Sequence, residues 1–162
     1  DRAKEKTIDK FTDYLNTQFK ESNGHITRKQ KFRVIKFSAF DPKGSPIYHT
    51  NVMLAVLAKH VVVCLQSIRN TWERHQVKKE IEGCGKEVID ISPKEVASFC
   101  GNVLQLEKDG KLFVVMSEQA YNGFSAENLS TLKSYYTIIK SDISTIERIG
   151  GGSARCMLAE LF

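Results

Sequence analysis

An internal repeat constrains the fold of this 162-residue chain more than any other feature of its sequence. Residues 51–54 (Asn-Val-Met-Leu) align with residues 102–105 (Asn-Val-Leu-Gln) at an offset of 51 positions. Without a gap, the apolar run at 61–65 then falls on the apolar run at 112–116. Coincidence between two ordinary hairpin-helix-strand stretches is the alternative explanation. The repeat predicts a ββαβ unit that occurs twice in full, with the opening strand of a third unit after it.

Residue periodicity predicts the remaining elements and a mixed α/β fold. The expected helices cover 7–21, 72–82, a short stretch from Ser92 and 125–134, and the expected strands cover 31–40, 47–57, 61–65, 87–91, 103–106, 112–116, 136–139 and the residues after the last glycines. Thr71 is expected to cap the second helix. Units of this kind cannot close their own hydrophobic faces and must stack or circularise. The chain opens in the middle of a unit, with an αβ remnant at 7–40, so we expect earlier repeats on a missing N-terminal half.

Composition indicates a globular protein, with 41% hydrophobic and 27% charged residues and a net charge of +5. The basic residues form no stripe interleaved with aromatics, so we expect no nucleic-acid partner. No apolar run has the length of a membrane span, and the first residues lack a secretory signal. The four cysteines form no CxxC pair and no metal-ligand spacing, so we expect no metal. A reducing intracellular compartment, cytoplasm or mitochondrial matrix, is the simplest expectation.

The segment 150–157, Gly-Gly-Gly-Ser-Ala-Arg-Cys-Met, is the strongest candidate for chemistry. Glycines permit a close backbone approach to a bound substrate, and they lead directly to Cys156. The cation of Arg155 favours the thiolate, which is the reactive form of cysteine. The alternative is a glycine turn that enters a terminal strand, with Cys156 as a small core residue.

Four motifs resemble those of the amidinotransferase or arginine deiminase superfamily. They are Tyr-His-Thr-Asn-Val-Met at 48–53, Gly-Asn-Val-Leu-Gln-Leu at 101–106, Val-Val-Met-Ser at 114–117 and the segment 150–157. The chain looks most similar to arginine-deiminase-related proteins described as citrulline-utilisation hydrolases. The resemblance implies a pentein, a five-bladed α/β propeller of ββαβ repeats. The chain would supply its C-terminal half, with repeats starting near 47, 98 and 149.

The resemblance also implies a mechanism that needs no cofactor. Cys156 matches the family's nucleophile, and His49 matches its general acid and base. The sulfur attacks the central carbon of a guanidino or ureido group, and water later hydrolyses the covalent intermediate. The repeat places Cys156 and His49 on the first strands of different units, so both can face one cavity. A hydrogen-bonded structural histidine is the alternative for His49.

The expected substrate is a small amidine or ureido amino acid. We expect Asn51, Arg155, Ser153, Gly152 and Asn102 to contribute to its binding. Arginine-processing relatives carry aspartate where this chain has Asn51, and a neutral amide fits a ureido group better than a guanidinium. Asn51, Asn102 and Ser153 occupy equivalent repeat positions, so a structural role is the alternative for all three. Arg155 holds a substrate carboxylate, tunes Cys156 or pairs with a nearby acid.

Two functions of different classes fit these patterns. One is a cysteine hydrolase acting on carbon–nitrogen bonds of arginine-like or citrulline-like compounds. The other is a catalytically inactive pentein domain that serves as a structural or interaction subunit, in a homo-oligomer or a larger complex. The acids that orient the histidine come from earlier repeats in the superfamily. Cys156 and His49 together favour the hydrolase.

Overall fold

The computed structural model describes residues 5–23 and 32–159. It separates the chain into two regions, Asp1–Lys36 and Phe37–Phe162. In the first region, helix α1 (Glu5–Asn23) confirms the helix expected at 7–21. The backbone of Phe32 is tied to it, because the N–H of Phe32 donates to Oδ1 of Asn16 at 2.7 Å and Nδ2 of Asn16 donates back to its carbonyl at 3.1 Å.

The strand expected at 31–40 is wrong for the residues that the structure describes. Residues 32–39 belong to no strand, and Phe40 forms only an isolated bridge with Pro46. Residue 31 lies outside the described residues. An alternating apolar pattern makes a strand only when a neighbouring backbone supplies its hydrogen bonds, and no ladder forms along these residues.

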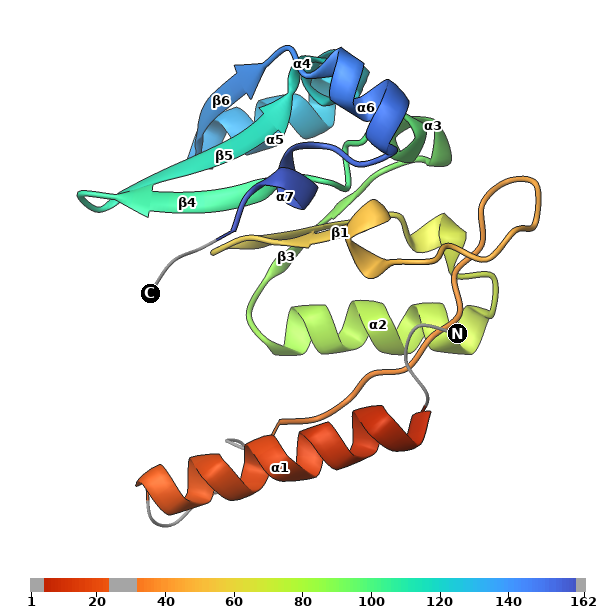
Figure 1. The fold of residues 1–162 in the computed structure, drawn as a ribbon, viewed down its shortest axis with the longest axis vertical. Coiled ribbons are helices and arrows are strands. Elements are labelled where there is room, and N and C mark those ends of the chain that lie inside the picture. Colours follow the sequence, from red (N-terminus) through yellow and green to blue (C-terminus); the bar gives the residue numbers. More distant parts are fainter. Residues whose placement is uncertain (1–4, 24–31, 160–162) are drawn as a thin grey trace. The chain divides into compact units, whose positions relative to one another are not determined.

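The second region contains both ββαβ units of the predicted repeat (Figure 1). Its elements, in chain order, are the 3-10 helix η2 (Thr50–Val52), β1 (Leu54–Val56), β2 (His60–Val63), the 3-10 helix η3 (Leu65–Ser67), α2 (Thr71–Gly83), β3 (Glu87–Asp90), α3 (Pro93–Ala97), β4 (Leu104–Lys108), β5 (Lys111–Ser117), α4 (Glu118–Gly123), α5 (Ala126–Tyr135), β6 (Thr137–Ser141), α6 (Ser144–Gly150) and α7 (Ala154–Met157). Helix α4 was not expected from the sequence.

Two three-stranded sheets share one topology. Their orders are β1-β2-β3 and β4-β5-β6, and in each sheet the first pair is antiparallel and the second pair parallel. Leu54 pairs with Val63 in the first hairpin, and the residues 51 positions later, Gln105 and Val114, also pair. The repeat therefore extends to the hydrogen-bond register of the hairpins.

The gapless repeat ends at the helical crossover. His60 pairs with Glu87, 27 positions later, whereas Phe113 pairs with Thr137, 24 positions later. The second crossover is three residues shorter, so the third strands match at a different offset from the hairpins. Figure 1 shows α2 along the first sheet and α5 along the second, where each helix contacts the third strand of its own unit.

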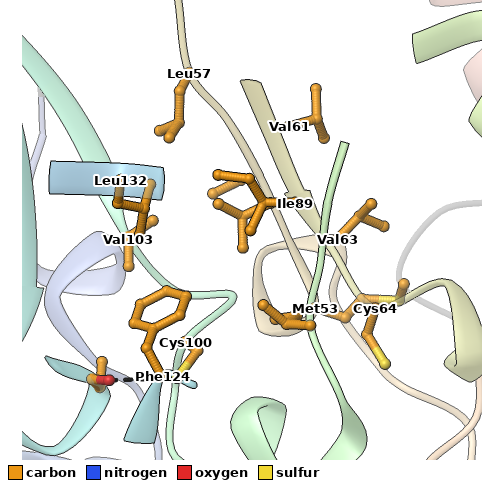
Figure 2. Packing of buried hydrophobic residues seen from close by; sticks show 14 of the residues in the cluster. Met53, Leu57, Val61, Val63, Cys64, Ile89, Cys100, Val103, Phe124 and Leu132 are labelled. Atoms are coloured by element: carbon orange, nitrogen blue, oxygen red, sulfur yellow. Dashed lines mark hydrogen bonds between the residues drawn. The ribbon is translucent and has the colours of Figure 1, made fainter. Parts of the chain in front are cut away.

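The core lies between these two units. All four residues of β2 are buried, and β2 is the middle strand of its sheet, paired on both sides. Figure 2 shows side chains of the first unit, among them Met53 and Ile89, gathered next to Val103 and Phe124 of the second. Burial of such side chains stabilises a fold by about 1.5–3 kcal/mol each. The two ββαβ units therefore share one hydrophobic core.

The ends of several elements follow from local chemistry. Helix α3 begins with Pro93 and has a full capping box, in which Ser92 and Glu95 bond to each other's backbone N–H groups. The expected cap of α2 is wrong by one residue. Asn70, and not Thr71, accepts hydrogen bonds from the first turn, at 2.9 and 3.1 Å. No described helix is long and apolar enough to cross a membrane.

Candidate active site

A glycine-rich turn carries the chain from α6 to Cys156. Gly151 caps α6 with a φ of +67°, a left-handed conformation that favours glycine. Behind the turn, the hydroxyl of Ser153 donates to Oε1 of Glu147 at 2.6 Å, and both side chains are buried. The turn is thereby fixed to the preceding helix, and it presents Cys156 with an exposed side chain.

The backbone passes very close to the Cys156 side chain. A Cβ added to Gly152 would lie 3.0 Å from Cβ and 3.2 Å from Sγ of Cys156. A side chain at position 152 would therefore crowd the thiol. The close approach expected from the sequence was to a bound substrate, whereas the structure shows the backbone of Gly152 close to the side chain of Cys156 itself.

The third-unit strand predicted for these residues is wrong. Residues 154–157 form the one-turn helix α7, in which the N–H of Cys156 donates to the carbonyl of Ser153 at 2.9 Å. The N–H of Arg155 donates to the carbonyl of Asn102 at 3.4 Å. These donors are used within the turn and on a loop, so the segment builds no ladder with a neighbouring strand.

Asn102 faces the sulfur of Cys156. Its Nδ2 lies 3.2 Å and its Oδ1 3.5 Å from Sγ, so the whole edge of the amide is turned towards the thiol. The same Nδ2 donates to the backbone carbonyl of Asn51 at 2.9 Å. Asn102 is only 2% exposed. One buried amide thus joins the starts of the first and second units to Cys156.

A cavity of about 350 Å³ opens beside this junction. Three polar side chains line it: Asn51, Gln105 and the half-buried Arg155. Its remaining lining comes from β1, β4 and the residue before β4: Leu54, Ala55, Val56, Val103 and Leu104. An apolar wall with a few polar groups and one cation fits a small molecule that carries a carboxylate.

His49 lies just before the first strand and not on it, which corrects the sequence prediction. It is the N-terminal cap of η2, and its Nδ1 accepts the N–H of Asn51 at 3.2 Å. With Nδ1 as acceptor, the proton of the neutral ring is on Nε2. The ring is exposed, and within the described part of the chain no hydrogen bond joins it to Cys156. The two are linked indirectly, through Asn51 and Asn102.

Two site-forming residues had no role assigned from the sequence. Gln105 lines the cavity, and its Oε1 accepts the N–H of Ala58 at 2.6 Å, which leaves its amide protons for other partners. The repeat offset, which places Gln105 on Cys156, was the signal for it. Glu147 was not singled out, because its contact with Ser153 depends on the turn between them. Across the described ranges, no three His, Cys, Asp or Glu side chains are grouped for a metal.

Comparisons with known proteins identify the family. A family model described as N,N dimethylarginine dimethylhydrolase, eukaryotic, matches residues 5–162. Searches of curated proteins and of solved structures find no match. The match spans both units and every site residue named above, and it confirms the resemblance to the pentein superfamily. The chain therefore belongs to the eukaryotic N,N-dimethylarginine dimethylhydrolase family, a family of hydrolases that act on the carbon–nitrogen bonds of amidines.

Proposed function

We propose that this chain is a cysteine hydrolase that acts on the guanidino or ureido carbon–nitrogen bond of arginine-like or citrulline-like compounds. One observation carries the proposal: an exposed Cys156 thiol faces the Asn102 amide beside a cavity lined by Asn51 and Arg155. The name of the matching family makes N,N-dimethylarginine the first substrate to test.

The proposed reaction of a guanidino substrate needs one nucleophile and one proton carrier. The Cys156 thiol gives its proton to Nδ1 of His49, and the resulting thiolate bonds to the central guanidino carbon and forms a tetrahedral intermediate. This intermediate collapses, the bond to one nitrogen breaks, and the departing amine takes a proton from His49. Water, which returns a proton to His49, then adds to the same carbon. The carbon–sulfur bond breaks, Cys156 is released, and a ureido product remains.

The lining of the cavity supports an amino-acid-sized substrate. About 350 Å³ lies at the small end of the range for ligand pockets. We propose that the Arg155 guanidinium holds the substrate carboxylate, since a fork of N–H donors matches two carboxylate oxygens. Asn51 would offer its amide to the group that reacts. Gly152, Ser153 and Asn102 would act from behind, because Ser153 and Asn102 are buried and Gly152 lies against Cys156.

We further propose that the two ββαβ units are successive blades of a pentein propeller. Their shared topology and hairpin register support this arrangement. In the same scheme α7 opens the third repeat near 149, since Ser153 follows Asn102 by the repeat offset.

The test is amine release by the full-length protein. N,N-dimethylarginine, arginine and citrulline are supplied separately, and dimethylamine or ammonia is measured. Cys156→Ala is the inactive variant, and Cys84→Ser is the matched control because Cys84 is the other exposed cysteine. We expect turnover of at least one compound, a loss of at least about 10³-fold in Cys156→Ala and no loss in Cys84→Ser.

Two results would overturn the proposal. Turnover that survives in Cys156→Ala would remove the cysteine mechanism. No turnover of any of the three compounds by folded protein would favour the inactive pentein domain that serves as an interaction subunit.

A further inference from the structure

We propose that Asn102 is a positioning residue whose amide holds Cys156 in place and donates the hydrogen bond that stabilises its thiolate. The inference rests on the proposed function and gives Asn102 a role other than substrate binding. It is carried by the contacts of one amide group with two segments that are 51 and 54 positions away in the sequence.

Both protons of the Asn102 amide have acceptors. One is donated to the carbonyl of Asn51 at 2.9 Å, and the other points to Sγ of Cys156 at 3.2 Å. The first bond fixes the rotation of the amide plane, so the second proton is aimed at the sulfur. A thiolate gains more from such a bond than a neutral thiol does, because hydrogen bonds to a charged acceptor are stronger.

The amide serves both protonation states of the sulfur. When Cys156 is a thiol, its S–H donates to Oδ1 of Asn102 at 3.5 Å. When the proton leaves to the solvent or to a base, the sulfur keeps the electron pair and accepts from Nδ2. The side chain does not need to turn between the two states, which is what preorganisation means for a charge that forms during a reaction.

The backbone around Asn102 is held on both sides. A Cβ at Gly101 would lie 2.6 Å from the carbonyl oxygen of Val52, so the two backbone segments touch here. The N–H of Asn102 donates to the carbonyl of Phe99 at 2.8 Å, and Phe99 has the unusual φ of +64°. A residue held this firmly can position another group, since little conformational freedom is left for it to lose.

The test follows the alkylation of Cys156 by iodoacetamide in the full-length protein between pH 5 and pH 10. All variants carry Cys84→Ser, so that Cys156 is the exposed thiol, and mass spectrometry of its peptide gives the rate. Asn102→Leu keeps the shape but has no donor. Asn102→Asp keeps the shape and puts a negative charge beside the sulfur. Asn128→Asp is the matched control, because Asn128 also donates its amide twice, at 2.9 and 3.2 Å, in another part of the unit.

The expected order of alkylation rates at pH 7 is parent, then Asn102→Leu, then Asn102→Asp. The loss of one hydrogen bond to a thiolate predicts a decrease of about tenfold for the leucine variant, with the midpoint of the pH profile moved upward. Asn128→Asp is expected to keep the parent profile. If Asn102 only supported the fold, its loss would loosen the site and make alkylation faster or leave it unchanged.

A profile that is unchanged or faster in both Asn102 variants would overturn the inference. Should Asn102→Asp fail to fold, Asn102→Leu decides alone, since it adds no charge. The outcome is separate from that of the proposed function. Parent protein that turns over substrate while the Asn102 variants alkylate normally would contradict only this inference. A shifted profile in protein without turnover would contradict only the proposed function.

Discussion

The four cysteines show how local surroundings separate reactive from structural side chains. Cys64 and Cys100 are completely buried. Burial raises the pKa of the Cys100 thiol well above its ordinary value, so this residue stays protonated. Cys84 is exposed at the end of α2, and among the described residues no amide side chain is hydrogen-bonded to its sulfur. Cys156 combines exposure with a hydrogen-bonded amide neighbour, which supports the proposal that it is the nucleophile.

Replacement of Gly101 by alanine is predicted to disturb the site from outside it. The new Cβ would lie 2.6 Å from the carbonyl oxygen of Val52 and 2.8 Å from Cα of Met53, and backbone atoms cannot move aside cheaply. We expect the free energy of unfolding to decrease by about 1–3 kcal/mol in chemical denaturation, together with slower turnover.

Gly83→Ala is the control for this substitution, because a Cβ at Gly83 meets nothing within 4 Å. Alanine is favoured over glycine in a helix, so this variant is expected to be as stable as the parent or up to about 1 kcal/mol more stable. Equal stability of the two variants would show that Gly101 is not in tight contact with the first unit.

At the scale of elements, Glu95 connects two helices that the sequence presents as independent. Its carboxylate accepts the N–H of Ser92 at 2.7 Å, the N–H of Ser125 at 2.9 Å and the amide of Asn128 at 2.9 Å. Burial by itself raises the pKa of Glu95, but these donors outweigh it and hold the pKa below the ordinary value. The capping box of α3 was readable from the sequence, whereas its extension to α5 was not.

Glu95→Ala is therefore predicted to destabilise more than the loss of one helix cap. Three partly buried donors, at the starts of α3 and α5, would lose a charged acceptor, and we expect a decrease of about 2–4 kcal/mol in the free energy of unfolding. Glu82→Ala, which removes the exposed pair with Lys78, is expected to cost about 0.5 kcal/mol or less. A similar small cost for both, measured by urea denaturation, would contradict the connecting role.

The elements that were predicted correctly are those whose signals are local. Alternation and apolar runs identified the hairpins, and the short helix expected from Ser92 is α3. Two of the errors, the strands expected at 31–40 and after the last glycines, have one cause. A strand exists only if another strand pairs with it, and the sequence of one segment does not contain that partner.

On the scale of the whole second region, His60 lies where the two ββαβ units pack together. It is 1% exposed on β2, and its Nδ1 is 2.9 Å from the hydroxyl of Tyr136 in the second repeat. Burial lowers the pKa of His60, and the cation of Lys59 lowers it further, whereas Glu87, with a carboxylate oxygen 3.7 Å away, opposes the shift. The packing around His60 therefore favours the neutral imidazole.

This predicts a pH dependence of stability with a definite sign. Because the folded state lowers the pKa of His60, the unfolded chain binds more protons near and below its ordinary value of 6.5. The contribution of His60 is present above that value and is lost as the pH falls through it. We expect the free energy of unfolding to decrease between pH 7 and pH 5, and this slope to be smaller in His60→Gln.

His75→Gln is the matched control, since His75 is exposed on α2. It is expected to keep the slope of the parent protein between pH 7 and pH 5, measured by urea denaturation at each pH. An equal slope in His60→Gln and the parent would mean that another group causes the dependence.

The sequence by itself determined the repeated ββαβ unit, the apolar strand at 61–65 and the residues worth testing at the site, because period, apolar run and turn chemistry act between near neighbours. Only the tertiary structure decided that residues 154–157 form a helix, that His49 caps a turn before β1 and that Asn102 lies between Asn51 and Cys156. The contacts of Asn102 join segments about 50 residues apart, and they exist only once both sheets have packed on one core.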